Sequence, residues 1–229
     1  MKIGLITIHH AYNFGAMLQS FATLKILEDF GHEVEFIDYD NKTFAEERQI
    51  FLSCDSVGNF FRNIRALLQF KQLRTRISLY ENFYKKFKVS KVKYNHININ
   101  EVSGYDVIIT GSDQTFSLYL TENPIDIRPF FLENIKCSKK ISYASSMGEK
   151  FHKLTSEDDV WMKKCFADFD HLSVRERGSA DYIEKLTGMR PEVVLDPTLL
   201  RSAEQWCLDA TDTDEVKGDY IAFYTVLSE

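Results

Sequence analysis

The sequence predicts an α/β protein with a doubly wound, mostly parallel sheet. Short apolar runs that suit buried strands alternate with amphipathic helical segments through residues 1–200. Polar loops follow several of these apolar runs directly. Strands that alternate with helices usually pair in parallel and carry helices on both faces, so this order favours a doubly wound sheet over an antiparallel one.

The first elements are expected to be a strand, a helix and a second strand. Residues 2–8 form an apolar run typical of a buried strand. A helix is predicted at residues 15–30, where Gly31 is a favourable residue to end it. Its apolar side chains recur at helical spacing at Leu18, Phe21, Ala22, Ile26 and Phe30. The second strand is predicted at residues 33–37, after a right-handed crossover.

A long aromatic helix is predicted next, at residues 60–87, with a break near its middle. One apolar stripe runs along it, made of Phe60, Ile64, Leu67, Ile77, Tyr80, Phe83, Tyr84 and Phe87. The later predicted elements are strands at 107–110 and 141–144, a helix at 156–166, a strand at 172–174, a helix at 179–186, a strand at 192–195 and a short helix at 203–208.

The pattern changes near residue 200. Residues 211–218 are polar and acidic, like a linker, and residues 220–226 form a fresh apolar run. We therefore expect residues 1–200 to form one domain. Residues 201–229 would be a linker and the first strand of a second domain that this chain lacks.

Composition limits the classes of protein. The chain has 229 residues, of which 44% are hydrophobic, enough for a large core. The low content of proline and glycine, four and ten residues, argues against disorder. The sequence has neither an apolar run long enough to span a membrane nor a signal peptide, which predicts a cytoplasmic protein. Cys54, Cys137, Cys165 and Cys207 are widely scattered, so buried free thiols are expected rather than a zinc site or a redox pair.

The charge is unevenly distributed. The chain carries −6, but residues 62–93 contain ten Lys or Arg and one acid, Glu81. The negative remainder argues against non-specific nucleic-acid binding by the whole chain. Two interpretations of the basic block stay open. It is either a solvated helix face over core aromatics, or a surface that docks a lipid-linked or anionic sugar carrier at the membrane surface, on its inner face.

Three segments share a layout of strand, polar loop and helix, at residues 6–15, 107–114 and 172–181. In the first, Asn13 and Gly15 would let backbone N–H groups approach an anion, although Asn13 could instead simply cap the helix. The preceding His9 and His10 are interpreted as an acid or base, or as structural residues. Only one of the three glycines of a dinucleotide-binding loop is present, so no nicotinamide cofactor is expected.

The second loop, Gly111-Ser112-Asp113-Gln114, follows the strand at 107–110. Ligands of open α/β sheets lie outside the carboxyl ends of the strands. Asp113 could accept from a sugar hydroxyl or act as a general base, and Gln114 could bind a second hydroxyl. A capped turn is the alternative. A further loop, residues 142–148, has small hydroxyl side chains but no His-Asp pattern that would mark a nucleophilic serine.

In the third segment, Arg175 follows the strand at 172–174. Its guanidinium could clamp a carboxylate. The alternative is a structural ion pair with Glu176 or with Asp196, and Asp196 could also orient Arg175 toward a ligand.

Four ordered blocks of this sequence resemble the polysaccharide pyruvyl transferase family. They are residues 10–19 (HAYNFGAMLQ), 111–114 (GSDQ), 142–148 (SYASSMG), and 173–176 (SVRE) followed by 195–200 (LDPTLL). The resemblance implies two facing Rossmann-like domains, as in the glycosyltransferase-B architecture, of which this chain would be the first half. It also implies that Arg175 contacts phosphoenolpyruvate, and that an arginine and a histidine come from the second half.

We therefore expect an enzyme that transfers a pyruvyl group from phosphoenolpyruvate to a sugar of a polysaccharide or its lipid-linked precursor. Asp113 and Arg175 are the expected catalytic residues; Asn13, Gly15, Gly111, Ser112, Gln114 and Glu176 are expected to bind substrate. Neither a metal nor another cofactor is expected. This chain alone should turn over poorly. The alternatives are a glycosyltransferase that uses a nucleotide-sugar, and a non-catalytic binding fragment.

Overall fold

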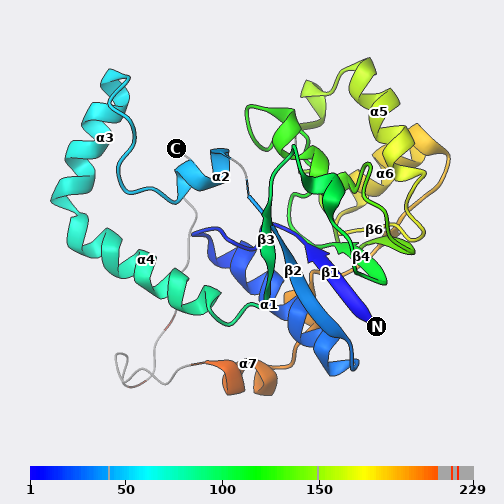
Figure 1. Cartoon of the computed structure of the whole chain (residues 1–229), viewed down its shortest axis with the longest axis horizontal. Coiled ribbons are helices and arrows are strands. Elements are labelled where there is room, and N and C mark those ends of the chain that lie inside the picture. The colour runs from blue at the N-terminus through cyan, green and yellow to red at the C-terminus, as the bar shows by residue number, and fades with distance from the viewer. Residues whose placement is uncertain (41, 149, 211–217, 219–220, 222–229) are drawn as a thin grey trace.

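The protein is built around a five-stranded parallel sheet, as the computed structural model shows (Figure 1). The structure describes residues 1–40, 42–148, 150–210, 218 and 221. The strands are β1 (Lys2–Ile6), β2 (Glu33–Tyr39), β3 (Val89–Tyr94), β4 (Val107–Thr110) and β5 (Lys139–Ser142). Their order is β3-β2-β1-β4-β5, and every pairing is parallel. This is the strand order of a Rossmann-like sheet, which confirms the predicted fold class.

Two short strands continue the same direction beyond β5. Strands β6 (Ser173–Val174) and β7 (Glu192–Val193) pair in parallel. Single bridges join Ile141 to His171 and Ser145 to Val174. The loops after β4, β5 and β6 therefore begin at the same side of the molecule, at the carboxyl ends of these parallel strands.

The α-helices are α1 (Phe14–Asp29), α2 (Lys42–Glu47), α3 (Val57–Leu68), α4 (Phe70–Tyr84), α5 (Ser156–Phe166), α6 (Arg177–Thr187) and α7 (Ala203–Asp209). Short 3-10 helices lie at Ile99–Glu101, Pro124–Asp126, Arg128–Phe131, Lys150–Lys153 and Pro197–Leu200. Among the described helices, none combines the length and apolar character needed to cross a membrane.

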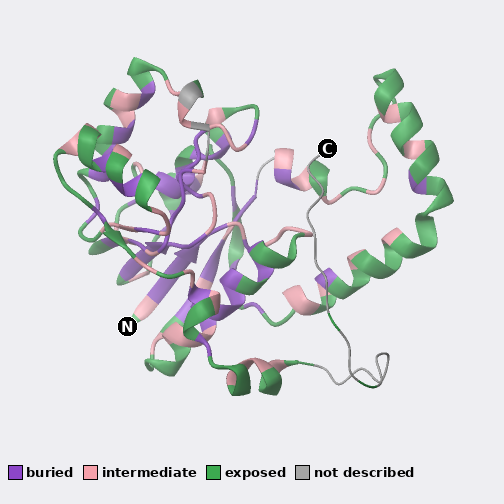
Figure 2. Ribbon diagram, turned by 180° about the vertical axis from the view of Figure 1, so that it is seen from behind, coloured by how far each residue is buried: buried purple, intermediate pink, exposed green. Residues whose placement is uncertain are grey.

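Each face of the sheet has its own apolar core, which is why the sheet is doubly wound. Side chains alternate along β1, so Ile3 and Leu5 join one cluster while Ile6 joins the other. The first cluster includes Met17 and Phe21 of α1 and Tyr80 of α4. The second includes side chains of α5 and α6. Figure 2 shows the sheet and the helix faces turned to it as buried.

Local sequence explains several helix ends. The Asn13 side chain accepts from the Ala16 N–H at 3.1 Å and caps α1. Thr155 and Asp158 cap α5 reciprocally. Gly188, with φ at +80°, ends α6 in the left-handed conformation that glycine adopts without strain. The strand at 107–110 and the helix at 156–166 have the predicted bounds, and the predicted break of the long helix falls at Gln69.

Several predictions are wrong. No α-helix follows β4: the described residues from 111 to 138 form turns and 3-10 helices, so the second loop does not lead into a helix dipole. Strand β3 and helix α2 were not predicted. The apolar stripe of the long helix is core only in its second half, because Phe60, Ile64 and Leu67 are exposed. Of the four free cysteines, only Cys165 is buried. Except for residues 218 and 221, the predicted linker at 211–218 and the predicted strand at 220–226 lie outside the described residues.

Candidate functional site

A cavity of about 410 Å³ lies beyond the carboxyl ends of β1 and β4. Its walls come from the loop before α1, the turn after β4, helix α2 and the residues after β6 and β7. It brings together five of the eight predicted site residues, namely Asn13, Gly15, Asp113, Gln114 and Arg175. Gly111, Ser112 and Glu176 do not line it.

Arg175 is held at the cavity by two carboxylates. Its Nη1 donates to Asp196 Oδ2 at 3.1 Å, and its Nε lies 3.8 Å from Glu176 Oε2. The side chain is 34% exposed. Its Nη2 group forms no hydrogen bond with the other described residues, and a planar guanidinium can use that remaining edge to bind an anion. The structural ion pairs foreseen from the sequence therefore coexist with an accessible cation.

Asp196 is fixed at the base of this arrangement. It accepts from the Thr198 N–H and hydroxyl and from the Ser112 hydroxyl as well as from Arg175. Burial alone would raise the pKa of Asp196, but these hydrogen bonds and the guanidinium hold the pKa below its ordinary value. Asp196 is therefore an ionised anchor that orients Arg175.

The pKa of Asp113 is shifted in the opposite direction to that of Asp196. Burial raises the pKa of its carboxyl, and the Gln114 N–H and Arg175 only partly offset this. Its backbone has φ at +93°, a strained conformation for a residue with a side chain, and its carbonyl is held by the Ser146 N–H at 2.8 Å. Two carboxyl groups near one arginine thus have pKa values shifted apart, as paired acid and base groups often do.

The first loop gives the cavity a helix N-terminus. Asn13, Gly15 and Ala16 line the wall where α1 begins. The Asn13 side-chain oxygen is already occupied as the cap, so the loop offers backbone N–H groups and the positive end of the helix dipole rather than the Asn13 acceptor.

The three predicted residues outside the cavity wall support it from behind. A Cβ on Gly111 would lie 3.0 Å from Thr7 Cβ, so close packing requires glycine there. Ser112 is fully buried and donates to Asp196 at 2.9 Å. Glu176 accepts from the Met147 N–H at 3.2 Å and from the Ser179 hydroxyl, and so joins the 142–148 loop to α6.

The two histidines lie outside the cavity wall. His9 is 1% exposed, and its Nδ1 lies 2.9 Å from the Thr7 carbonyl oxygen. The His10 ring stacks on Tyr84 at 4.0 Å, and its Nε2 lies 3.0 Å from Glu81 Oε1. Burial lowers the pKa of His10. Neither side chain lines the cavity.

Sequence reasoning missed other lining residues. Gln19 of α1, Phe44 and Glu47 of α2, and Thr198 also line the cavity. Gln19 and Thr198 lie inside the resembling blocks, which could have drawn attention to them. Residues 42–47 carry no motif, so nothing in the sequence marked α2 as a wall of the cavity.

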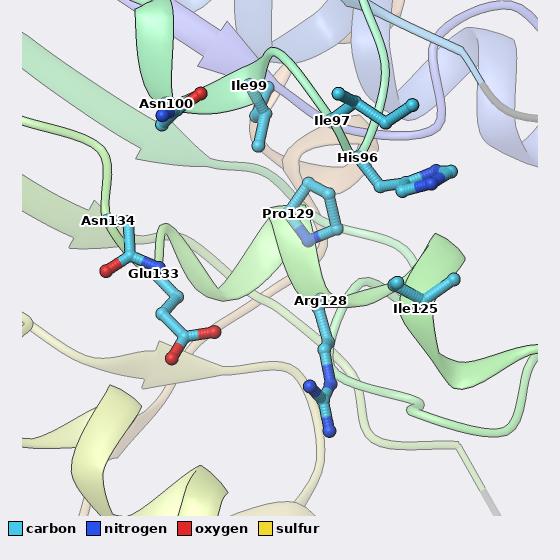
Figure 3. A pocket seen from close by; sticks show the side chains of 9 residues that line it. All are labelled: His96, Ile97, Ile99, Asn100, Ile125, Arg128, Pro129, Glu133 and Asn134. Atoms are coloured by element: carbon cyan, nitrogen blue, oxygen red, sulfur yellow. The ribbon is translucent and has the colours of Figure 1, made fainter.

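A separate hollow of about 330 Å³ lies between the 3-10 helices at 99–101 and 128–131 (Figure 3). None of the eight predicted site residues lines it. Arg128 lies over the Trp161 ring at 4.7 Å, and Glu133 accepts from the Trp161 indole N–H at 2.9 Å. Both charged side chains are thus engaged in local contacts. Within the part of the chain that the structure describes, no group of three or more His, Cys, Asp or Glu could hold a metal ion.

Comparison with known proteins gives one match. A family model described as polysaccharide pyruvyl transferase matches residues 13–229. Neither a curated protein nor a solved structure matches the chain. The matched range includes every predicted site residue.

Proposed function

Because the chain belongs to the polysaccharide pyruvyl transferase family, we propose that it transfers the pyruvyl group of phosphoenolpyruvate to two hydroxyls of a sugar, forming a pyruvate ketal. The acceptor would be a saccharide or its lipid-linked precursor, met in the cytoplasm. The observation that carries the proposal is the pairing of an accessible Arg175 with two carboxyls of opposite character, Asp113 and Asp196, in one cavity.

The reaction needs an anion clamp and proton transfer. The methylene carbon of the enol must gain a proton, after which the oxygen of a sugar hydroxyl bonds to the neighbouring carbon and loses its proton. Phosphate then leaves with the electrons of its C–O bond. A second hydroxyl bonds to the same carbon, loses its proton and closes the ring. None of these steps requires a metal or a redox cofactor.

In this proposal Arg175 binds the carboxylate of phosphoenolpyruvate, and the N-terminus of α1 faces its phosphate. Asp196 keeps the guanidinium in place. Asp113 gives or takes the proton, for which a raised pKa is suitable. Gln114 binds an acceptor hydroxyl. A Cβ on Gly148 would lie 3.0 Å from Gln114 Oε1, so glycine there leaves room for that side chain.

The test is an assay of phosphate release and ketal formation with phosphoenolpyruvate and a panel of free and carrier-linked saccharides. We expect Arg175→Ala to lower the transfer rate by about 10–100-fold, the loss of one charged hydrogen-bonding group. Arg177→Ala is the matched control, since Arg177 is exposed and does not line the cavity.

Donor binding separates this proposal from a glycosyltransferase. Phosphoenolpyruvate should raise the melting temperature of the wild-type protein, and nucleotide-sugars should not. The proposal would be rejected if a nucleotide-sugar raised the melting temperature and phosphoenolpyruvate did not. It would also be rejected if the Arg175→Ala variant transferred the pyruvyl group at the wild-type rate.

A further inference from the structure

Helix α3 carries its apolar side chains on the face turned away from the protein. This apolar face consists of Val57, Phe60, Phe61, Ile64, Leu67 and Leu68. Their exposed fractions range from 40% for Ile64 to 84% for Leu68. A surface helix of a globular protein normally turns such a face to the core. In Figure 2, α3 extends away from the sheet with most of its surface exposed.

The polar side of α3 faces the protein instead. Asn63 donates to the Leu52 carbonyl at 2.8 Å and accepts from the Leu52 N–H at 2.9 Å. Ala66, on the same side, is buried. The helix is therefore fixed by its polar side, and its apolar face is left for something outside the described residues.

Residues 56–80, which are α3 and most of α4, form an arm whose charges have one sign. Residues 56–80 contain Arg62, Arg65, Lys71, Arg74 and Arg76 but no acid. Because the whole chain carries −6, all other residues together carry −11. Among the described residues, no carboxylate forms an ion pair with any of these five side chains. The arm thus has an excess positive potential that an anionic partner would neutralise.

We propose that α3 and the start of α4 dock on the surface of a lipid bilayer with anionic headgroups. Phenylalanine and leucine on one face with arginine and lysine beside them are the composition of helices that lie in a membrane interface. Lys71 and Arg74, which are exposed at the start of α4, would add attraction to the headgroups. A symmetric contact with a second copy is disfavoured, since it would place two acid-free arms against each other.

Docking there would bring the candidate site close to the lipid. Glu47 of α2 lines the site cavity, and it also lines a hollow of about 500 Å³ with Arg62, Arg65 and Arg76. The two hollows therefore share a wall. An acceptor attached to a lipid carrier could reach the site without leaving the membrane. The docking does not depend on the proposed reaction, because binding to vesicles is measured without turnover.

The test is flotation of the purified protein with vesicles of phosphatidylcholine alone or mixed with phosphatidylglycerol. We expect binding only to the mixed vesicles, with weakening by salt. Phe60→Ser, Phe61→Ser and Leu68→Ser combined should abolish it. Lys71→Glu with Arg74→Glu should weaken it about tenfold or more, from the attraction lost per basic residue.

Matched controls separate the arm from general effects. Ile97→Ser, Val160→Ser and Met189→Ser remove equally exposed apolar side chains elsewhere. Lys163→Glu with Lys164→Glu makes the same charge change on α5, where both residues are exposed. Circular dichroism checks that all variants fold.

The inference is overturned by three results. The first is that the wild type does not bind anionic vesicles. The second is that the triple serine variant binds them as well as the wild type does. The third is that the wild type binds no vesicles and sediments as a dimer, whereas the triple serine variant sediments as a monomer. The last result would assign the face to a second copy of the chain.

Discussion

The sheet edge and the α3–α4 arm are built in opposite ways. At the sheet edge, the polar side chains of Arg175, Ser112 and Asp196 form hydrogen bonds with one another next to a buried core. On α3, apolar groups are exposed, and polar groups make the internal contacts. A helical pattern predicts where an apolar stripe lies, but not whether the stripe is covered by the same domain.

The largest difference is expected between a phenylalanine on α3 and one that follows α4. Phe87, just after α4, packs on Phe21 and Phe36 in the core. Phe87→Ala should lower the free energy of unfolding by about 3–5 kcal/mol. Phe61→Ala on α3 should change it by less than about 0.5 kcal/mol. Urea unfolding measures both. Equal costs would mean that α3 packs as part of the core.

The second effect concerns the anchor of Arg175. Asp196→Asn keeps the size of the side chain but removes its charge, so it should cost about 1–3 kcal/mol of stability. The pKa of Asp196 is lowered in the folded state, so its ionised form stabilises the protein above its ordinary value of 3.8. That contribution is lost as pH falls through the lowered pKa. Urea unfolding at several acidic pH values should therefore show a steeper loss in the wild type than in the variant.

Asp113→Asn should have the opposite sign. The pKa of Asp113 is raised in the folded state, so keeping its carboxylate ionised at neutral pH costs stability, and that cost vanishes as pH falls toward 3.8. Asparagine also tolerates a positive φ. The variant should be more stable by about 0.5–1 kcal/mol at neutral pH and yet transfer pyruvate poorly. A destabilised variant would show that Asp113 is a structural cap.

The smallest effect is expected where the two regions meet. Glu81, near the end of α4, accepts from the Tyr12 hydroxyl at 2.7 Å and lies 3.0 Å from His10 Nε2, which joins the end of α4 to the loop before α1. Glu81→Gln should cost only about 0.5–1 kcal/mol, because the pair is partly exposed. Tyr12→Phe is the matched variant, and the two changes should be less than additive in a double-mutant cycle. Full additivity would mean that the contact does not form.

The regular part of the fold followed from periodicity. The strand at 107–110 is an unbroken apolar run, and the helix at 156–166 has its cap and stripe in sequence, so both bounds were predicted. Strand β3 was not predicted because it lies at the edge of the sheet, where Lys91, Val92 and Lys93 are exposed and interrupt the apolar pattern. Gly111 resembles a ligand-binding glycine, but its contact with Thr7 is a tertiary one that no local pattern contains.

The same distinction holds for the site. Asp113 and Arg175 follow strands directly, so the parallel topology alone placed them at a common edge. The contact of Arg175 with Asp196 was predicted, but the raised pKa of Asp113 was not, because it depends mainly on burial in the folded chain. Glu47 was not predicted as a lining residue, because residues 42–47 carry no motif and α2 reaches the cavity only through the tertiary fold.

The order of the strands has one further consequence. The chain leaves β1 toward α1 on one face of the sheet, whereas after β4 it continues into the core on the other face. The two halves of the cavity are therefore supported by different apolar clusters, one on each face of the sheet. Substitutions that change the lining on one side of the cavity should therefore leave the packing beneath the other side intact, so the shape of the cavity can vary without loss of the fold.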